Sequence, residues 1–206
     1  MQEKTHSNIE SAIAKKKAGE IFFLTDFRGK GTQAAIKQTM SRLARKGNVK
    51  RLAHGIYYLP KTDPLLGEVR PDADEVVKML AKKEHIQVKP AGAYALHRLG
   101  LTTQVPTKRV YVTNGNPRQL MLGRMQIRFK ATSAKKLAMK GKVSSLVIQA
   151  IEELGVDQIR PDLEMKIKNL LLKEDPRTLR YDLTLASTKV NDYIVKLMKK
   201  HREEND

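Results

Sequence analysis

The sequence predicts an α+β protein, and three observations lead to this prediction. The chain has 206 residues with a hydrophobic fraction of 40%, which is enough to build a core in one large domain or two small ones. Several stretches place apolar residues at the spacing of a helix face. Other short runs are rich in β-branched and aromatic residues and are bounded by turn residues, which is typical of strands.

The chain begins with a predicted helix and a short strand. Residues 4–18 carry apolar residues at helical spacing, and Gly19 is a natural stop. The apolar run 20–24 follows as a strand. Thr25 is then expected to cap a brief second helix.

A basic third helix and a hairpin come next. The helix begins at Gly31 or Thr32 and ends near Gly47. The runs VKRL and GIYYLP follow, and Gly55 between them can adopt the positive φ that a hairpin turn needs. Helix, short strand, two helices and a hairpin is the element order of a winged helix-turn-helix.

Beyond Pro60 the sequence predicts a linker, a second domain and a helical tail. The second domain has helices over DADEVVKMLAKKEH, AGAYALHRLGL and VSSLVIQAIEELG, and a small antiparallel sheet formed by KRVYVTNG with RQLMLG and MQIRFKAT as hairpin partners. The tail is helical, with breaks at Asp175-Pro176 and near Ala186-Ser187. The predicted boundaries are a winged helix-turn-helix at 1–62, a linker at 63–71, a basic α/β domain at 72–157 and a helical extension at 158–206.

The charge indicates a polyanionic partner. Forty Lys and Arg residues against 22 Asp and Glu residues give a net charge of +18. Thr25 to Arg51 contains Asp26 as its only acid, and His85 to Ile151 contains no acid at all. Within the second stretch we expect a secondary basic surface formed by Lys108, Arg109, Arg118, Arg124, Arg128 and Lys130.

The third helix has the pattern of a DNA recognition helix. Ile36, Met40 and Leu43 share one narrow stripe, and the opposite half carries no carboxylate. The candidates for base contacts are Thr32, Gln33, Lys37, Gln38 and Ser41. The candidates for backbone phosphates are Arg42, Arg45, Lys46, Lys50, Arg51 and His54. The alternative is a basic surface helix with nothing bound.

Other site types are not expected. RGKGT lacks the spacing of a phosphate-binding loop, no two of the five histidines have helical ligand spacing, and there is no cysteine. We therefore expect no catalytic residues, no metal site, no cofactor and no enzymatic activity. The apolar runs fall far short of the roughly 20 residues needed to cross a bilayer, and the first residues lack a secretory signal. A cytoplasmic location without a membrane partner is the expectation.

The segment GAYALHRLGLTTQVPTKRVYVTNG, residues 92–115, resembles the AbiEi family of antitoxins, as does the ending RLAHGIYYLP of the N-terminal part. The likeness covers roughly residues 5–155. It implies a transcriptional repressor that binds inverted repeats in its own promoter, within an abortive-infection or type IV toxin–antitoxin system. It also implies that the protein counteracts a nucleotidyltransferase-like toxin, with or without direct contact.

Two other functions remain open at this stage. An RNA-binding or ribosome-associated protein would use the same charge. A nuclease or other enzyme would need a carboxylate or nucleophile cluster that the sequence does not provide. The operator sequence, the oligomeric state, the chemistry of a toxin and the role of the tail after residue 157 are not determined by the sequence.

Overall fold

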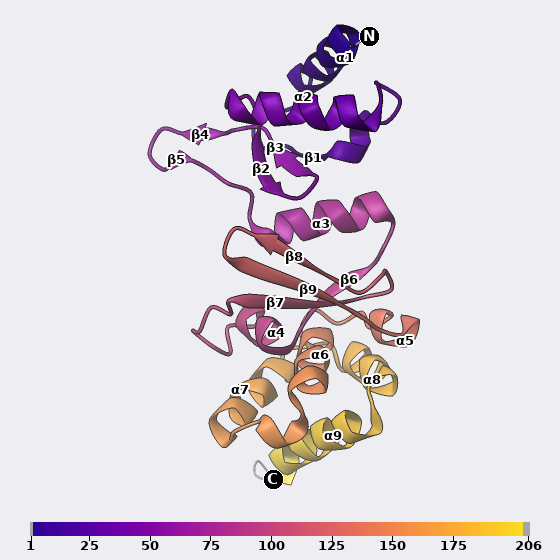
Figure 1. The fold of residues 1–206 in the computed structure, drawn as a ribbon. Helices are drawn as coiled ribbons and strands as arrows, with labels where there is room; N and C mark the ends of the chain where they lie inside the picture. The colour runs from indigo at the N-terminus through magenta and orange to yellow at the C-terminus, as the bar shows by residue number, and fades with distance from the viewer. Residues whose placement is uncertain (1, 204–206) are drawn as a thin grey trace. The chain divides into compact units, whose positions relative to one another are not determined.

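The structure, a computed structural model, describes residues 2–203 of the chain (Figure 1). The chain divides into two compact units. Unit 1 comprises residues 1–80 and 121–123, and unit 2 comprises residues 81–120 and 124–206. Both combine helices with small sheets, which agrees with the predicted α+β class.

Unit 1 has a helical pair beside a three-stranded antiparallel sheet of order β1-β3-β2. Its elements in chain order are α1 (Gln2–Ala14), β1 (Ile21–Phe23), the 3-10 helix η1 (Leu24–Phe27), α2 (Gln33–Arg45), β2 (Lys50–Ala53), β3 (Ile56–Tyr58), β4 (Thr62–Asp63) and β5 (Gly67–Glu68). The predicted third helix is α2, and the predicted hairpin is β2–β3 with Gly55 at a φ of +73°. Both predictions are confirmed.

The core of unit 1 explains why α2 has a fixed orientation. Ile36, Met40 and Leu43 are at most 5% exposed, as predicted, and pack in one cluster with Ile9 of α1. The Phe22 ring adds a stacked contact with a second aromatic ring of the sheet at 6.1 Å. Because each side chain of this size contributes about 1.5–3 kcal/mol on burial, the stripe holds one face of α2 inward.

Three predictions for unit 1 need correction. The first helix ends at Ala14, four residues before the predicted end. The brief second helix is a 3-10 turn with Phe23 at its N-cap, because the Asp26 carboxylate accepts a hydrogen bond from the Phe23 N–H at 2.7 Å. The segment predicted as a linker also contains β5, which pairs with β4 as a short hairpin that the sequence did not indicate.

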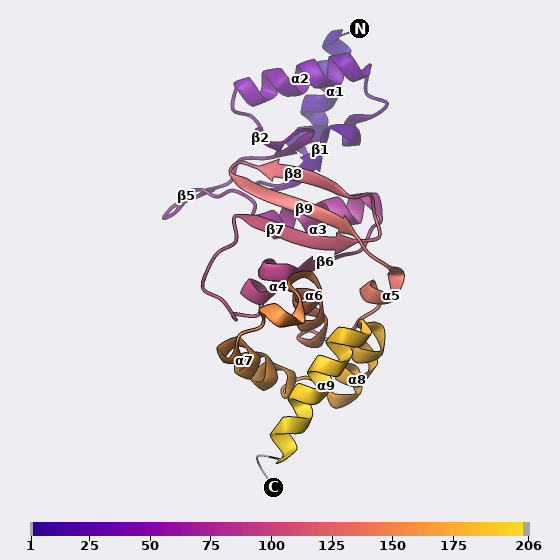
Figure 2. The ribbon, with the colours of Figure 1, turned by 60° about the horizontal axis from the view of Figure 1, so that its bottom comes forward.

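Unit 2 contains a four-stranded sheet of order β6-β7-β9-β8 and most of the helices (Figure 2). The preceding helix α3 (Ala73–Glu84) has residues in both units. The elements that follow it are β6 (Val88–Ala91), α4 (Gly92–Arg98), β7 (Lys108–Thr113), β8 (Arg118–Leu122), β9 (Met125–Ala131), α5 (Ala134–Leu137), α6 (Ser144–Leu154), η2 (Val156–Gln158), α7 (Pro161–Leu171), α8 (Pro176–Leu185) and α9 (Thr188–Glu203). Asp72 caps α3, accepting a hydrogen bond from the Glu75 N–H at 2.8 Å.

The sheet of unit 2 differs from the predicted meander. β6 and β7 are antiparallel, but β7 and β9 are parallel, so the sheet is mixed. The prediction that β8 and β9 are hairpin partners of β7 is therefore wrong, because β9 pairs with β7 in parallel and β8 does not pair with β7. The sequence pattern did not predict β6, because Pro90 weakens the local strand pattern. The structure tolerates Pro90 because β6 is an edge strand.

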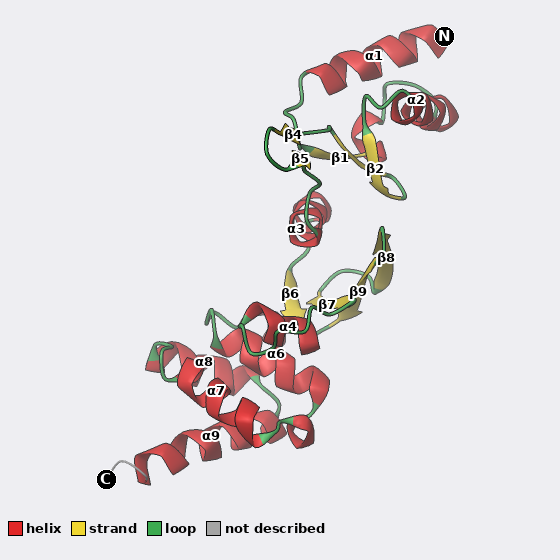
Figure 3. Cartoon of the chain, turned by 90° about the vertical axis from the view of Figure 1, so that its left-hand side faces the viewer, coloured by secondary structure: helices red, strands yellow, loops and turns green. Residues whose placement is uncertain are grey.

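Figure 3 shows the C-terminal helices α7, α8 and α9 gathered beside α4 and α6, and these helices share one core. Ile148 and Ile151 of α6 are fully buried in a cluster that also contains Ile167 of α7, Leu183 of α8 and Ile194 of α9. The breaks at Asp175-Pro176 and Ala186-Ser187 fall between helices, as predicted. The tail thus packs on the preceding helices α4 and α6, a point that the sequence left open.

Gly31 tests the packing of α1 on the loop before α2. A Cβ atom at this position would lie 2.4 Å from the Thr5 hydroxyl oxygen, whereas one at Gly29 would meet nothing within 4 Å. Both residues have positive φ. We expect Gly31→Ala to lower the free energy of unfolding by roughly 2–4 kcal/mol and Gly29→Ala by about 1 kcal/mol, measured by urea denaturation. Equal losses in the two variants would contradict the close contact.

Candidate nucleic-acid interface

Helix α2 positions the predicted recognition residues. Thr32 is its N-cap, and its hydroxyl accepts a hydrogen bond from the Ala35 N–H at 3.3 Å. This contact satisfies one of the N–H groups that a helix start leaves unpaired. The sequence thereby begins the helix at Gln33 and fixes which later residues face outward.

The base-contact candidates lie together on the surface of α2. All five, Thr32, Gln33, Lys37, Gln38 and Ser41, are exposed. Successive side chains along this face are four residues apart, so Gln33, Lys37 and Ser41 form one row and Gln38 and Arg42 lie beside it. No acid occurs in α2, and the nearby Asp26 is occupied by the Phe23 N–H. The face therefore offers donors and amides with no carboxylate among them.

The turn of the β2–β3 hairpin carries a fixed guanidinium. Arg51 Nε donates to the Ala53 carbonyl oxygen at 3.2 Å, and its Nη2 lies 3.1 Å from His54 Nδ1. Both Arg51 and His54 are exposed. Because these contacts hold the side chain along its own turn, less conformational entropy is lost when the guanidinium meets a phosphate.

Lys50 is not a free cation, which the sequence did not indicate. Its Nζ lies 3.6 Å from Glu68 Oε2 on β5. The Tyr58 hydroxyl donates to the other oxygen of Glu68 at 2.6 Å. Burial and this carboxylate raise the pKa of Tyr58 to about 12, and the Tyr58 hydrogen bond lowers the pKa of Glu68. Glu68 therefore remains ionised and partly neutralises Lys50.

The six residues of the predicted secondary surface do not form one free patch. Arg109 lies opposite Ile127 and Arg128 lies opposite Val110, so the two arginines point to different faces of the sheet. The Arg109 guanidinium also lies 4.8 Å from the centroid of the Tyr94 ring and donates to the Tyr94 hydroxyl at 3.3 Å. This side chain is therefore partly buried against the Tyr94 ring.

Acids from outside the acid-free stretch neutralise several of its cations. Arg118 pairs with Glu84 at 2.6 Å, and Lys130 pairs with Glu153. Three residues of the predicted group make no ion pair within the described residues: Lys108 and Arg128, which are partly buried, and Arg124, which is exposed. An acid-free segment is thus not the same as an acid-free surface.

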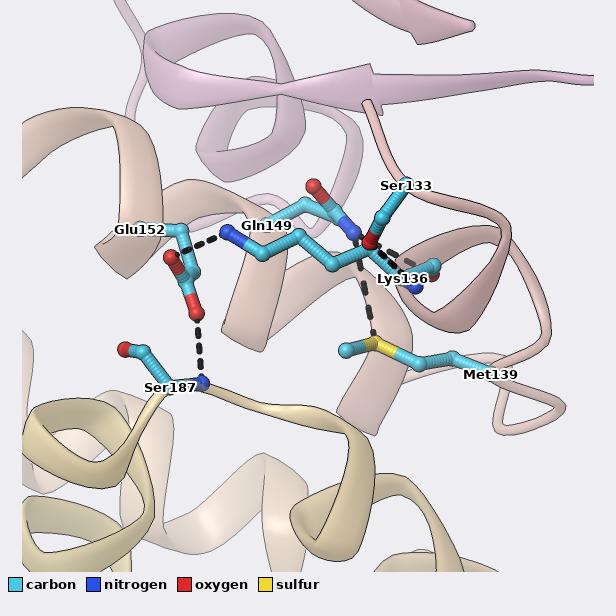
Figure 4. A network of polar contacts seen from close by, with 6 residues as sticks. All are labelled: Ser133, Lys136, Met139, Gln149, Glu152 and Ser187. Atoms are coloured by element: carbon cyan, nitrogen blue, oxygen red, sulfur yellow. Dashed lines mark hydrogen bonds and ion pairs between the residues drawn. The ribbon is translucent and has the colours of Figure 1, made fainter. Parts of the chain in front are cut away.

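Glu152 likewise neutralises a cation of the acid-free stretch, and its carboxylate is partly buried (Figure 4). Its Oε2 accepts from Lys136 Nζ at 2.6 Å, and its Oε1 accepts from the Ser187 N–H at 2.8 Å. Gln149 lies alongside, with its side-chain nitrogen 3.4 Å from the Lys136 carbonyl oxygen. Burial alone raises the pKa of Glu152, but the hydrogen bonds from Lys136 and Ser187 outweigh it, so the pKa is lowered overall.

The arrangement of the described residues also bears on two other kinds of site. Among those that the structure describes, no three His, Asp or Glu side chains come together as a metal site would require. In the same range, no helix is both long and apolar enough to span a membrane.

The fold and the basic helix define a two-unit α+β protein whose first unit exposes a helix face without carboxylates. The chain belongs to a family of unknown function, DUF6088, whose family model matches residues 8–179. A comparison with curated proteins gives no match. Neither result connects the chain with the AbiEi family or with a toxin–antitoxin system, so that resemblance stays a prediction.

Glu152 provides a test of how unit 2 uses its acids. Because the pKa in the folded state lies below the reference value of 4.5, the stabilisation is present above that pH and is lost as pH falls through the folded-state pKa. We expect Glu152→Gln to lower the free energy of unfolding by about 1–2 kcal/mol at neutral pH. The gap to the unsubstituted protein should close in acid, as followed by urea denaturation at several pH values.

The matched control is Asp157→Asn, which breaks the exposed pair that Asp157 forms with Lys189 at 2.8 Å. Exposed pairs contribute little, so this variant should be nearly neutral. Similar losses in both variants, or a Glu152 effect independent of pH, would contradict the role assigned to the buried carboxylate.

Proposed function

We propose that the protein is a sequence-specific double-stranded DNA-binding regulator, with unit 1 acting as a winged helix-turn-helix. The observation that carries the proposal is the outer face of α2, where every base-contact candidate is exposed and no acid intervenes. The β2–β3 hairpin turn supplies the wing. An α-helix fits the major groove of B-DNA, where donor and acceptor patterns distinguish all four base pairs.

The proposed roles follow from side-chain chemistry. The Gln38 amide can donate to and accept from adenine in two hydrogen bonds, and Lys37 can donate to guanine. Ala34 is exposed on the same face and is small enough for the helix axis to come close to the bases. Arg42, Arg45 and Lys46 lie at the C-terminal end of α2, where cations can bind flanking phosphates.

The wing adds contacts to the sugar–phosphate backbone. Arg51 is already held against its own turn by Ala53 and His54, so its guanidinium keeps a defined position. Lys50 contributes less than its sequence position suggests, because Glu68 lies 3.6 Å from it. The wing therefore binds mainly through Arg51 and His54.

The biological role proposed for this binding comes from the AbiEi resemblance of the sequence. In that role the protein represses its own operon through promoter inverted repeats and serves as the antitoxin against a nucleotidyltransferase-like toxin. The family match describes no activity. A nucleotidyltransferase-like gene immediately downstream, together with relief of its toxicity by co-expression, would support the antitoxin part independently of DNA binding.

Gln38 tests base recognition. A selected duplex should be obtained by enrichment from random DNA, and a mixed-sequence duplex should serve as its competitor. We expect Gln38→Ala to lower the preference for the selected duplex by roughly 5- to 100-fold, which corresponds to about 1–3 kcal/mol, with little change on the mixed duplex. Fluorescence anisotropy with both duplexes measures the ratio.

Gln158→Ala is the matched control, because Gln158 is an exposed amide in unit 2. Arg42→Ala should weaken both duplexes about equally and reduce the salt slope by about 0.9. Failure to enrich any duplex, or tighter binding to structured RNA than to DNA, would overturn the proposed function.

Glu68 tests the neutralisation of Lys50. Gln at this position can still accept the Tyr58 hydrogen bond but removes the negative charge near Lys50. We therefore expect Glu68→Gln to bind duplex DNA roughly two- to fivefold more tightly. Lys50→Ala should have little effect alone but should abolish the gain in the Glu68→Gln background. Equal effects of Lys50→Ala in both backgrounds would show that Glu68 does not restrain this lysine.

A further inference from the structure

Two carboxylates accept hydrogen bonds from the backbone of the loop between α5 and α6. The Asp182 carboxylate of α8 accepts from the N–H groups of Lys140 and Gly141 at 2.7 and 2.9 Å. Glu174, between α7 and α8, accepts from the N–H groups of Val143 and Ser144 at 2.7 and 3.0 Å. Four backbone N–H groups from Lys140 to Ser144 therefore donate to two carboxylates of the C-terminal region.

This arrangement leaves the loop little freedom. Asp182 is fully buried, and its Oδ2 also accepts from the Ser144 hydroxyl at 2.6 Å. Removing one partner of a buried carboxylate is expensive, so the loop and α8 keep their relative positions. A Cβ atom at Gly141 would lie 1.8 Å from Ser144 Oγ and 2.8 Å from each carboxylate, so only glycine fits there.

The held loop presents cations outward. Lys140 and Lys142 are both exposed, and within the described residues neither has an ion-pair partner. Lys140 Nζ lies 4.9 Å from the centroid of the Tyr181 ring, which is 40% exposed on α8. Arg177 precedes Tyr181 by four residues, so the two residues lie on the same face of α8.

The carboxylates next to this patch are already engaged. Asp182 and Glu174 face the loop backbone, and Asp175 caps α8 by accepting from the Thr178 N–H at 2.8 Å. This distinguishes Lys140 and Lys142 from Lys130 and Lys136, whose ammonium groups are paired with acids. Two lysines without ion-pair partners in the described residues, on a backbone held by hydrogen bonds and with Lys140 beside the exposed Tyr181, suit a polyanion backbone, because cations bind phosphates and the ring can pack on sugar.

We infer that the loop Lys140–Ser144, with Arg177 and Tyr181, is a second DNA-contact surface that binds backbone phosphates without recognising sequence. The inference rests on the proposed function for the identity of the polyanion, but it concerns unit 2 and different residues. Lys140 and Lys142 bind phosphates, and Asp182 and Glu174 act as positioning residues that fix the loop.

The test uses the full-length protein and a mixed-sequence DNA duplex of about 30 base pairs, long enough for several phosphate contacts. Anisotropy titrations between about 0.05 and 0.3 M salt give the slope of log affinity against log salt. We expect Lys140→Ala/Lys142→Ala to reduce this slope by about 1.8 and to weaken binding roughly tenfold or more near 0.1 M salt. The control is Lys166→Ala/Lys196→Ala, which removes two exposed lysines of α7 and α9 and the same net charge.

Gly141→Ala supplies a second variant, because it displaces the loop without removing charge. It should also weaken binding, while circular dichroism and the thermal midpoint report whether unit 2 remains folded. Equal behaviour of the loop double variant and its control would overturn the inference, as would a loss seen only with a structured RNA. If Arg42→Ala of α2 still weakens DNA binding in that case, the proposed function survives and the second surface alone is excluded.

Discussion

The burial of one narrow stripe of α2 is the constraint on which the candidate interface depends. Ile36, Met40 and Leu43 pack against α1 and the aromatic residues of the first sheet, and they are nearly inaccessible to solvent. A helix with 3.6 residues per turn cannot bury that stripe without turning its other face outward. Rotating α2 would expose several large apolar side chains, at about 1.5–3 kcal/mol each. The core thus determines which polar side chains can meet a partner.

The positions of the carboxylates determine which cations remain available. Unit 2 contains the long segment without acids, yet Glu84, Glu152 and Glu153 reach its cations from either side in the chain. Those cations support the fold. Asp182 and Glu174 act differently, because their oxygens accept backbone N–H groups and leave the nearby lysines unpaired. The same residue type therefore neutralises one part of the surface and fixes the backbone beneath another.

Local patterns predicted the elements that local forces define. The α2 stripe, the Gly55 turn and the break before α8 all lie where the sequence indicated, because spacing and φ preference act within a few residues. β6 and the parallel pairing of β7 with β9 were missed. These depend on which strands meet across the sheet, and neither Pro90 nor the Asn-Gly pair after β7 carries that information.

The sequence by itself predicted most of the helices, the hairpin after α2 and the face that α2 turns outward, since periodicity leaves no other solution for the apolar residues of α2. Only the tertiary structure decided that Lys50 faces Glu68, that Arg109 packs on Tyr94 and that Lys140 has no ion-pair partner among the described residues. The physical reason is that charge pairing acts through space at about 4 Å, and the partners lie far apart along the chain. The charges counted along the sequence therefore showed that the protein is basic. The tertiary structure determined which of its cations lack a carboxylate partner and can bind a ligand.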